Sequence, residues 1–225
     1  MGADRIPDLE VYGPAPIVRM TEQLFGEEGV YGPDIRARLE HESSIFVFEE
    51  RGGKPPRKRP APRVKEVHAG DVVEGNGWKI TVGQASHVQP QLECLAFRLD
   101  SAEGSACYSG DSGGVCEELI ELARGCDVLI HMNHYFSGTE PTASYREACG
   151  NHRDNAVIAK RAGVKTLVLT HVLSQIDQPG VRQQIIREIH QEFDGEVIWG
   201  EDLMRLAFVG SGVVKIEQAK PLQTP

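Results

Sequence analysis

The 225-residue sequence predicts an α+β fold, in which a strand-rich middle is followed by helices that alternate with strands. Two observations support this. Short apolar or alternating runs lie between turn residues, and longer segments carry apolar residues at helical spacing. Glycine, proline and asparagine stand at the ends of these runs, where turns and helix caps require them.

The first quarter of the chain is predicted to contain two strands and two helices. Residues 8–12 alternate and end at a glycine-proline pair, which predicts a strand followed by a turn. Residues 15–27 and 32–41 show helical patterns, and Pro33 suits the first turn of the second helix. Residues 44–49 (SIFVFE) are predicted to form a short strand.

A basic, proline-rich segment follows at residues 51–65. Its four prolines exclude the interior of a helix or sheet. Its seven cations allow two interpretations: a solvated, semi-rigid loop, which we predict, or a contact site for RNA.

The remaining two thirds of the chain supply the alternating elements, with no visible internal repeat. We expect strands at 72–74, 78–82, 92–99, 105–108, 126–131, 165–170, 196–199 and 206–209, with helices at 112–124, at 151–162 and after Pro179.

Composition limits the class of protein. A net charge of −9 argues against general affinity for nucleic acid. Five cysteines, odd in number and without C-x-x-C spacing, indicate buried free thiols in a reducing compartment. No run of ~20 apolar residues could span a bilayer, and the N-terminus lacks the apolar core of a signal peptide. We therefore expect a cytoplasmic protein without membrane contact.

Three side chains that suit metal ions stand just past strand-like runs: His87, Asp111 and His171. Loops beyond strand ends commonly carry chemistry in α/β sheets, so this set predicts a metal site. For Asp111 the alternative is a cap of the helix predicted at 112–124, and for the histidines it is a structural role.

Three further histidines are candidates for the same site. His152 lies in the first turn of the helix at 151–162, where the helix dipole could tune it as an acid or base; the alternative is a surface histidine without a role. His131 and His134 follow another buried strand, and we interpret them as substrate-binding walls of the crevice.

The order of these signals resembles the metallo-β-lactamase fold hydrolases, on the branch of ribonuclease Z and the arylsulfatase-like phosphodiesterases. The resemblance covers the chain from Leu9 to Leu206. The matching stretches are Leu9-Glu-Val-Tyr-Gly-Pro14, Ser86-His-Val-Gln-Pro90, Tyr108-Ser-Gly-Asp-Ser112, Ala123 to His131, Gly150-Asn-His152, Ala162 to His171 and Gly200-Glu-Asp-Leu-Met204.

The resemblance implies a four-layer α/β/β/α sandwich that holds two zinc ions, or manganese or iron. By position, His87 and His171 would be metal ligands, Asp111 the bridging aspartate, and His152 the residue that assists the leaving group. The family's His-x-His-x-Asp-His motif does not precede Leu9. We therefore expect residues 1–225 to form a single domain that is the C-terminal portion of the sandwich, with its first sheet incomplete.

Two functional hypotheses follow. In the first, the chain is a hydrolase that cleaves a phosphodiester, sulfate ester or other ester with metal-activated water. In the second, it is a catalytically inactive remnant or scaffold, because three protein donors are too few for two metal ions. The expected partners are a small-molecule or nucleotide-like ester and, through the exposed sheet face, a second copy in a homodimer.

Overall fold

The computed structural model describes residues 9–209 and 213–217, and the chain divides into two compact units, residues 1–67 and 68–225. Each unit is described by itself. The single-domain interpretation of residues 1–225 stays a prediction.

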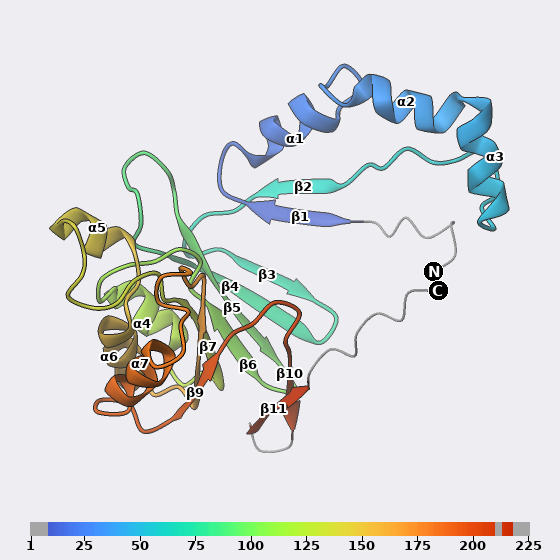
Figure 1. The fold of residues 1–225 in the computed structure, drawn as a ribbon. Helices are drawn as coiled ribbons and strands as arrows, with labels where there is room; N and C mark the ends of the chain where they lie inside the picture. Colours follow the sequence, from blue (N-terminus) through green and yellow to red (C-terminus); the bar gives the residue numbers. More distant parts are fainter. Residues whose placement is uncertain (1–8, 210–212, 218–225) are drawn as a thin grey trace. The chain divides into compact units, whose positions relative to one another are not determined.

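The first unit is a two-stranded parallel sheet with three helices inserted between its strands (Figure 1). Strand β1 (Glu10–Gly13) pairs with β2 (Arg63–Glu66), and α1 (Ile17–Phe25), α2 (Gly32–Glu40) and α3 (Glu42–Glu50) lie between them in sequence. The predicted first strand and first two helices are confirmed, apart from residue 8, which lies outside the described residues.

The strand predicted at residues 44–49 is wrong, because α3 covers them. The imidazole of His41 caps this helix by accepting a hydrogen bond from the Ser43 amide at 3.3 Å. Phe48 is buried, and the guanidinium of Arg57 lies 5.3 Å from the centre of its ring. A short apolar run suits a strand or a helix equally well, and the cap at His41 and the packing of Arg57 on Phe48 favour the helix.

The basic segment is irregular from residue 53 to residue 62, as its prolines predict, and then enters β2. It is not simply solvated. Arg59 donates to the carbonyls of Phe25 and Gly26 at 2.7 and 2.8 Å, where α1 ends and its last carbonyls lack helical partners. Part of the segment's charge therefore closes a helix end instead of facing water.

The second unit is built on a seven-stranded sheet, ordered β3-β4-β5-β6-β7-β8-β9. Pairing is antiparallel from β3 to β6 and parallel from β6 to β9. The strands are β3 (Val72–Gly75), β4 (Trp78–Gln84), β5 (Leu95–Ser101), β6 (Ser105–Tyr108), β7 (Val128–Met132), β8 (Thr166–Thr170) and β9 (Glu196–Trp199). These bounds confirm the predicted strands and the α+β class.

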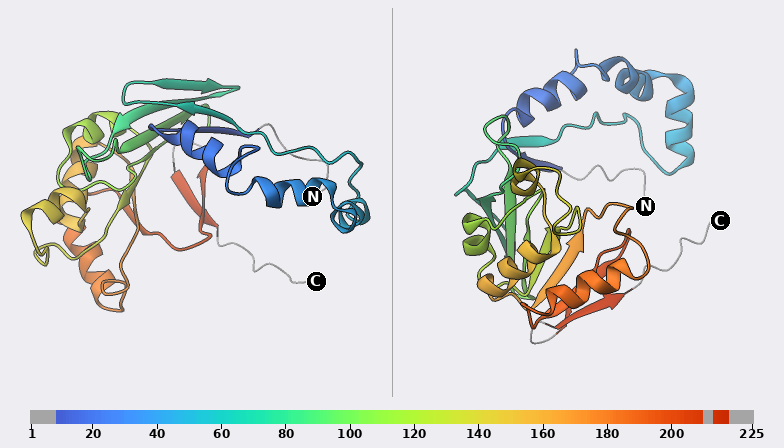
Figure 2. Two further views of the ribbon diagram at one scale, coloured as in Figure 1. Left: turned by 90° about the horizontal axis from the view of Figure 1, so that it is seen from above. Right: turned by 60° about the vertical axis from the view of Figure 1, so that its left-hand side comes forward.

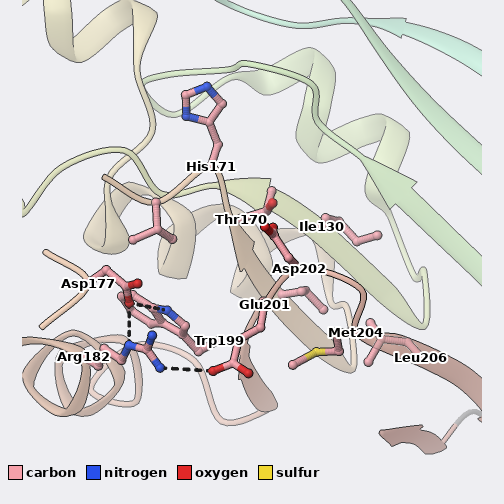
Figure 3. Close-up of a pocket in the computed structure, with 13 residues that line it drawn as sticks. Ile130, Thr170, His171, Asp177, Arg182, Trp199, Glu201, Asp202, Met204 and Leu206 are labelled. Carbon is pink, nitrogen blue, oxygen red and sulfur yellow. Dashed lines mark hydrogen bonds and ion pairs between the residues drawn. The ribbon is translucent and has the colours of Figure 1, made fainter. Parts of the chain in front are cut away.

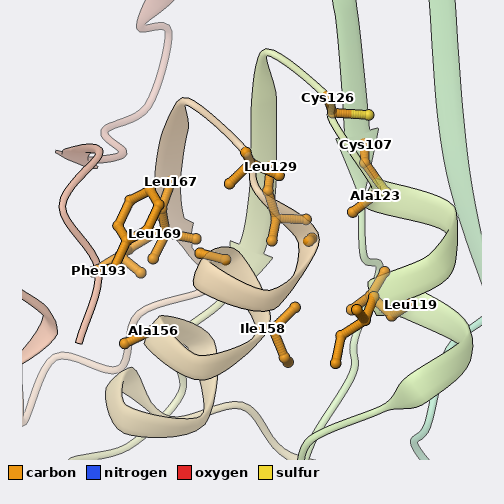
Figure 4. Packing of buried hydrophobic residues seen from close by; sticks show 14 of the residues in the cluster. Cys107, Leu119, Ala123, Cys126, Leu129, Ala156, Ile158, Leu167, Leu169 and Phe193 are labelled. Atoms are coloured by element: carbon orange, nitrogen blue, oxygen red, sulfur yellow. The ribbon is translucent and has the colours of Figure 1, made fainter.

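Helices cover one face of this sheet, as Figures 1 and 2 show. They are α4 (Glu117–Ala123), α6 (His152–Ala162) and α7 (Val181–Ile189), with the short α5 (Ala143–Ala148) between α4 and α6 in sequence. Alternate strand residues such as Leu129 and Leu167 point into the helix-covered core, where they join Leu119 and Ile158 (Figure 4). All four are fully buried.

The opposite face carries a smaller apolar cluster. Val128, Val168 and Ile198 lie there, packed against Met204, Leu206 and Phe208. These last residues belong to or precede β10 (Arg205–Val209), which pairs with β11 (Val213–Glu217) in an antiparallel hairpin. Further out on the sheet, Leu99 and Tyr108 stay 37 and 47 % exposed.

Two helix boundaries bear on the site. The helix predicted at 112–124 begins only at Glu117, so Asp111 does not cap it. Gly113, in this irregular segment, packs so closely on the backbone of Cys149 that a β-carbon would lie 2.3 Å from its nitrogen, so only glycine fits there. Helix α6 has the predicted ends: Asn151 caps it, and Gly163 stops it in the left-handed conformation with φ 66°.

None of the described helices has the length and hydropathy of a membrane span. All five cysteines are free thiols, and four of them are buried, as predicted.

We expect Asn151→Ala to lower the free energy of unfolding by about 2–3 kcal/mol. The side chain accepts from the amides of Arg153 and Asp154 and donates to Tyr135, all within a buried site. Thr142→Ala, at the exposed cap of α5, is the matched control and should cost about 0.5–1 kcal/mol. Equal losses in urea unfolding would show that Asn151 acts only as an ordinary cap.

Candidate functional site

The three predicted metal-site residues meet at one edge of the sheet. Strands β4, β6 and β8 run in the same direction, so their carboxyl ends share an edge, and His87, Asp111 and His171 follow these ends. The Nε2 atom of His87 lies 4.0 Å from Oδ2 of Asp111, and Nε2 of His171 lies 3.9 Å from Oδ1. Each oxygen of the carboxylate therefore faces a different imidazole.

The orientation of His87 is set by the backbone. Its Nδ1 lies 2.6 Å from the carbonyl oxygen of Ala148, which can only accept a hydrogen bond. Nδ1 therefore carries a proton, and Nε2 is the ring nitrogen that points toward Asp111. Metal-ligating histidines are held in this way, by a hydrogen bond from the other ring nitrogen.

His171 is positioned by its backbone and by a second imidazole. Its φ of 51° is one of two left-handed values at non-glycine residues in the described part of the chain, and such strain concentrates at functional sites. Its Nδ1 lies 2.9 Å from Nδ1 of His134, so one of the two nitrogens donates and the other accepts. Burial and then the neighbouring His171 lower the pKa of His134, which favours the neutral ring.

His134 thus lies at the site, but against His171. Its amide donates to the carbonyl of Gly150 at 2.8 Å, and its ring contacts that of Tyr145 at a centroid distance of 6.0 Å. The contact between the two histidines could not be read from the sequence, because it joins residues that follow two different strands.

His131 lies elsewhere, and this differs from its interpretation as a wall of the crevice. Side chains alternate along β7, so His131 shares the helix-covered face with Leu129 and is completely buried. Its Nδ1 bonds to the carbonyl of Met132 at 2.9 Å, while Nε2 has no hydrogen-bond partner among residues 9–209 and 213–217. Burial lowers the pKa of His131 to about 4.

His152 is also fully buried, which excludes the surface histidine considered as its alternative. The amide of Ser137 donates to its Nδ1 at 3.3 Å, so Nε2 carries the proton and donates to Oε2 of Glu188 at 3.0 Å. Burial lowers the pKa of His152, whereas this hydrogen bond lowers that of Glu188 to about 2. The pair therefore consists of a neutral imidazole and an ionised carboxylate.

The pairing of His152 with Glu188 was missed from sequence. Glu188 lies on α7, where the visible signal was the apolar stripe on the other side of the helix. Arg153 also donates to Glu188, at 2.8 Å. Neither His152 nor Glu188 contacts His87, Asp111 or His171 in the structure as described.

The donor set fits a metal centre in part. At about 4 Å neither imidazole makes a hydrogen bond to the carboxylate, and each nitrogen and the oxygen that it faces would have to move slightly closer to serve as two donors of one tetrahedral zinc ion. Asp111 offers two such positions, which is the arrangement expected of a bridging carboxylate. Each position has two protein donors, and no three His, Cys, Asp or Glu side chains of the described residues converge on one point. Zinc normally takes four donors.

The sequence signature of the beta-lactamase superfamily domain matches residues 19–172. This match covers more than half of the chain, so the chain belongs to the metallo-β-lactamase superfamily. It lies on the ribonuclease Z branch of these hydrolases, which confirms the resemblance and the fold expected from it.

Three relatives illustrate the relationship. Ribonuclease Z of Mycobacterium bovis BCG is 31 % identical over 212 residues, which make up 91 % of this chain and 68 % of that protein. The short form of human tRNase Z superposes with a TM-score of 0.53 at 16 % identity and covers 89 % of this chain and 66 % of its own. Zn(2+)-bound PqqB of Methylobacterium extorquens gives 0.52 at 11 % identity, with 84 and 62 % covered. The chain thus spans about two thirds of the length of these proteins, and none of them supports the inactive-scaffold alternative.

The buried His131 predicts a pH dependence of stability. Its pKa of about 4 in the folded protein is below the 6.5 of an exposed histidine, so its contribution is complete above pH 6.5 and is lost as pH falls toward 4. Between pH 7 and 5 this should cost about 2 kcal/mol of unfolding free energy. His131→Leu should remove that part of the slope in urea titrations and keep the part due to other groups such as His152. An unchanged slope would contradict the assignment.

Proposed function

We propose that this superfamily hydrolase cleaves phosphodiesters and that His87, Asp111 and His171 hold two zinc ions for this reaction. The supporting observation is the carboxylate of Asp111, whose two oxygens each face the Nε2 atom of a different histidine. Manganese or iron would suit the same donors, with zinc favoured by the two imidazoles. Since each position has two protein donors, water and groups beyond the described residues must complete the coordination.

Zinc bound there would supply Lewis acidity and an activated water to the reaction. The chain's own contribution is positioning and charge. Asp111 brings one negative charge to the metal positions, and the Ala148 carbonyl holds a proton of His87 on Nδ1, which leaves Nε2 as the ligating nitrogen. His134 orients His171 through the contact between their Nδ1 atoms. The part of the His134 ring that remains exposed could contact the substrate.

We assign proton transfer to His152, with Glu188 as its orienting partner. The hydrogen bond from Nε2 to Glu188 fixes the tautomer of the ring and would stabilise the imidazolium, which can form only when Nδ1 gives up its hydrogen bond from the Ser137 amide and accepts a proton in its place. Because the side chain of His152 is buried, proton transfer to a substrate requires the residues that cover the ring to move aside. Phe136 is one of them, with its ring 4.7 Å away between centroids.

The substrate class follows from the relatives and the charges. The mycobacterial relative at 31 % identity is named ribonuclease Z, which supports a phosphodiester of nucleotide type over a sulfate ester. A net charge of −9 and the engagement of Arg57 and Arg59 within the protein weaken general RNA binding, so we favour a small nucleotide-like ester.

The free thiols support a cytoplasmic location. The exposed Leu99 and Tyr108 support a homodimer, which sedimentation equilibrium would detect.

We expect zinc binding to depend on Asp111. Asp111→Asn removes the anionic charge between the two histidines and should weaken zinc binding at least ~10-fold. Affinity is measured by competition with a chromophoric chelator, and His190→Ala, an exposed histidine away from the site, is the control. Equal affinities in the two variants would contradict the proposed ligand role.

Measurements of zinc content and hydrolysis together should distinguish a metal ligand from the proton-transfer residue. In the zinc-loaded full-length protein, His171→Ala should lose metal and turnover of bis(4-nitrophenyl) phosphate together. His152→Ala should keep its zinc and lose turnover by ~10²–10⁴-fold. The zinc content of each variant is measured by elemental analysis on the same sample as its turnover. Loss of zinc from His152→Ala would identify it as a ligand, and full activity would leave it a purely structural residue.

A further inference from the structure

The C-terminal end of α5 bonds to the loops that carry His87 and Asp111. The last carbonyls of a helix have no partner within it, so they are available to neighbouring segments. Three successive carbonyls of α5 are used in this way: that of Arg146 by the Gly114 amide at 2.9 Å, that of Glu147 by the Ser86 hydroxyl at 3.2 Å, and that of Ala148 by Nδ1 of His87 at 2.6 Å. The position of α5 therefore bears on both loops.

Helix α5 depends on its surroundings for its position. It spans six residues and has no buried residue, and helices this short are not stable by themselves. Tyr145 gives it one attachment, because its ring contacts the rings of Tyr135 and His134 at centroid distances of 5.4 and 6.0 Å. Such contacts between rings leave the helix free to turn about them, so a directional attachment is needed as well.

An ion pair between α5 and α6 supplies this direction. Nε and Nη2 of Arg146 donate to the two carboxylate oxygens of Asp154, at 3.2 and 2.8 Å. A guanidinium that bonds to both oxygens fixes orientation as well as distance. Asp154 is buried in the first turn of α6 and also accepts from the side-chain amide of Asn151 at 2.7 Å, so the carboxylate is a fixed point.

The loop that follows His171 has a separate attachment. Figure 3 shows Asp177 between Arg182 and Trp199, from which it accepts hydrogen bonds at 2.5 and 3.1 Å. These residues belong to α7, β9 and the loop before α7. The ion pair of α5 thus acts on the side of the site that carries His87 and Asp111.

We propose that Arg146 and Asp154 are positioning residues of the candidate metal centre. Their ion pair holds α5 where the Ala148 carbonyl keeps a proton of His87 on Nδ1, which presents Nε2 to the metal position. Without the pair, α5 shifts and either nitrogen of His87 can carry the proton. The inference rests on the proposed function and adds two residues that act through the backbone of α5.

The tautomer of His87 can be observed without metal. Two-bond correlation spectra of the ¹⁵N-labelled full chain, before zinc is added, distinguish which ring nitrogen carries the proton, and a His87→Gln spectrum assigns the signals. Spectra are recorded at about pH 8.5, so that the two neutral tautomers are compared. We expect the proton on Nδ1 in the wild type and a mixture of tautomers in Arg146→Met.

Arg161→Met is the matched control. Arg161 donates to both carboxylate oxygens of Glu117, at 2.7 and 2.6 Å, and its side chain is 45 % exposed against 52 % for Arg146. It lies in the last turn of α6, away from α5, so its loss should leave the His87 tautomer unchanged.

Zinc affinity measures the consequence for the metal centre. In competition with a chromophoric chelator, Arg146→Met should bind zinc about 10-fold more weakly than the wild type. Arg146→Lys keeps the charge without the paired bonds and should fall between them. Adding Asp154→Asn to Arg146→Met should weaken binding little further, because both changes break the same pair.

An unchanged His87 tautomer in Arg146→Met, or an equal change in Arg161→Met, would overturn the proposal. Should Arg146→Met fail to fold, Asp154→Asn takes its place, since it keeps the shape of the side chain, and an unchanged tautomer there would have the same meaning. Absence of zinc binding by the wild type, with the change of tautomer present in Arg146→Met, would count against the proposed function alone.

Discussion

The direction of the strands is the constraint on which the site depends. Two antiparallel steps from β4 to β6, and two parallel steps from β6 to β8, leave all three strands pointing the same way. A change in any one pairing would carry His87, Asp111 or His171 to the opposite edge, some four to seven residues of extended chain away. Packing of α4, α6 and α7 on one face holds this arrangement, because the buried alternate residues of the strands fix their register.

The site joins strand ends that are far apart in sequence through the loops between them. The helix after β6 begins only at Glu117, and before it Gly113 lies so close to the backbone of Cys149 that no side chain would fit. The same neighbourhood supplies the Ala148 carbonyl that orients His87. The connection between α5 and α6 therefore determines both where Asp111 lies and which nitrogen of His87 faces it.

Electrostatics separates the histidines into two groups. His87 and His171, at the sheet edge, are partly exposed, and each faces one oxygen of Asp111 across about 4 Å without a hydrogen bond. The buried pair, His131 and His152, is held neutral by burial, and only His152 has an ionised partner. The same residue type, histidine, thus has different chemistry depending on its burial, and the sequence does not show which histidines are buried.

The sequence by itself determined the α+β class, most strand positions, the ends of α6 and the three residues at the sheet edge, because these depend on local periodicity, caps and strand ends. It could not place residues 44–49 in a helix, since Phe48 and His41 settle that through contacts. It also could not tell that His131 faces the core, that His152 pairs with Glu188, or that His134 contacts His171. Those outcomes depend on which face of a strand is covered and on which distant side chain completes a hydrogen bond, and only the tertiary structure decides both.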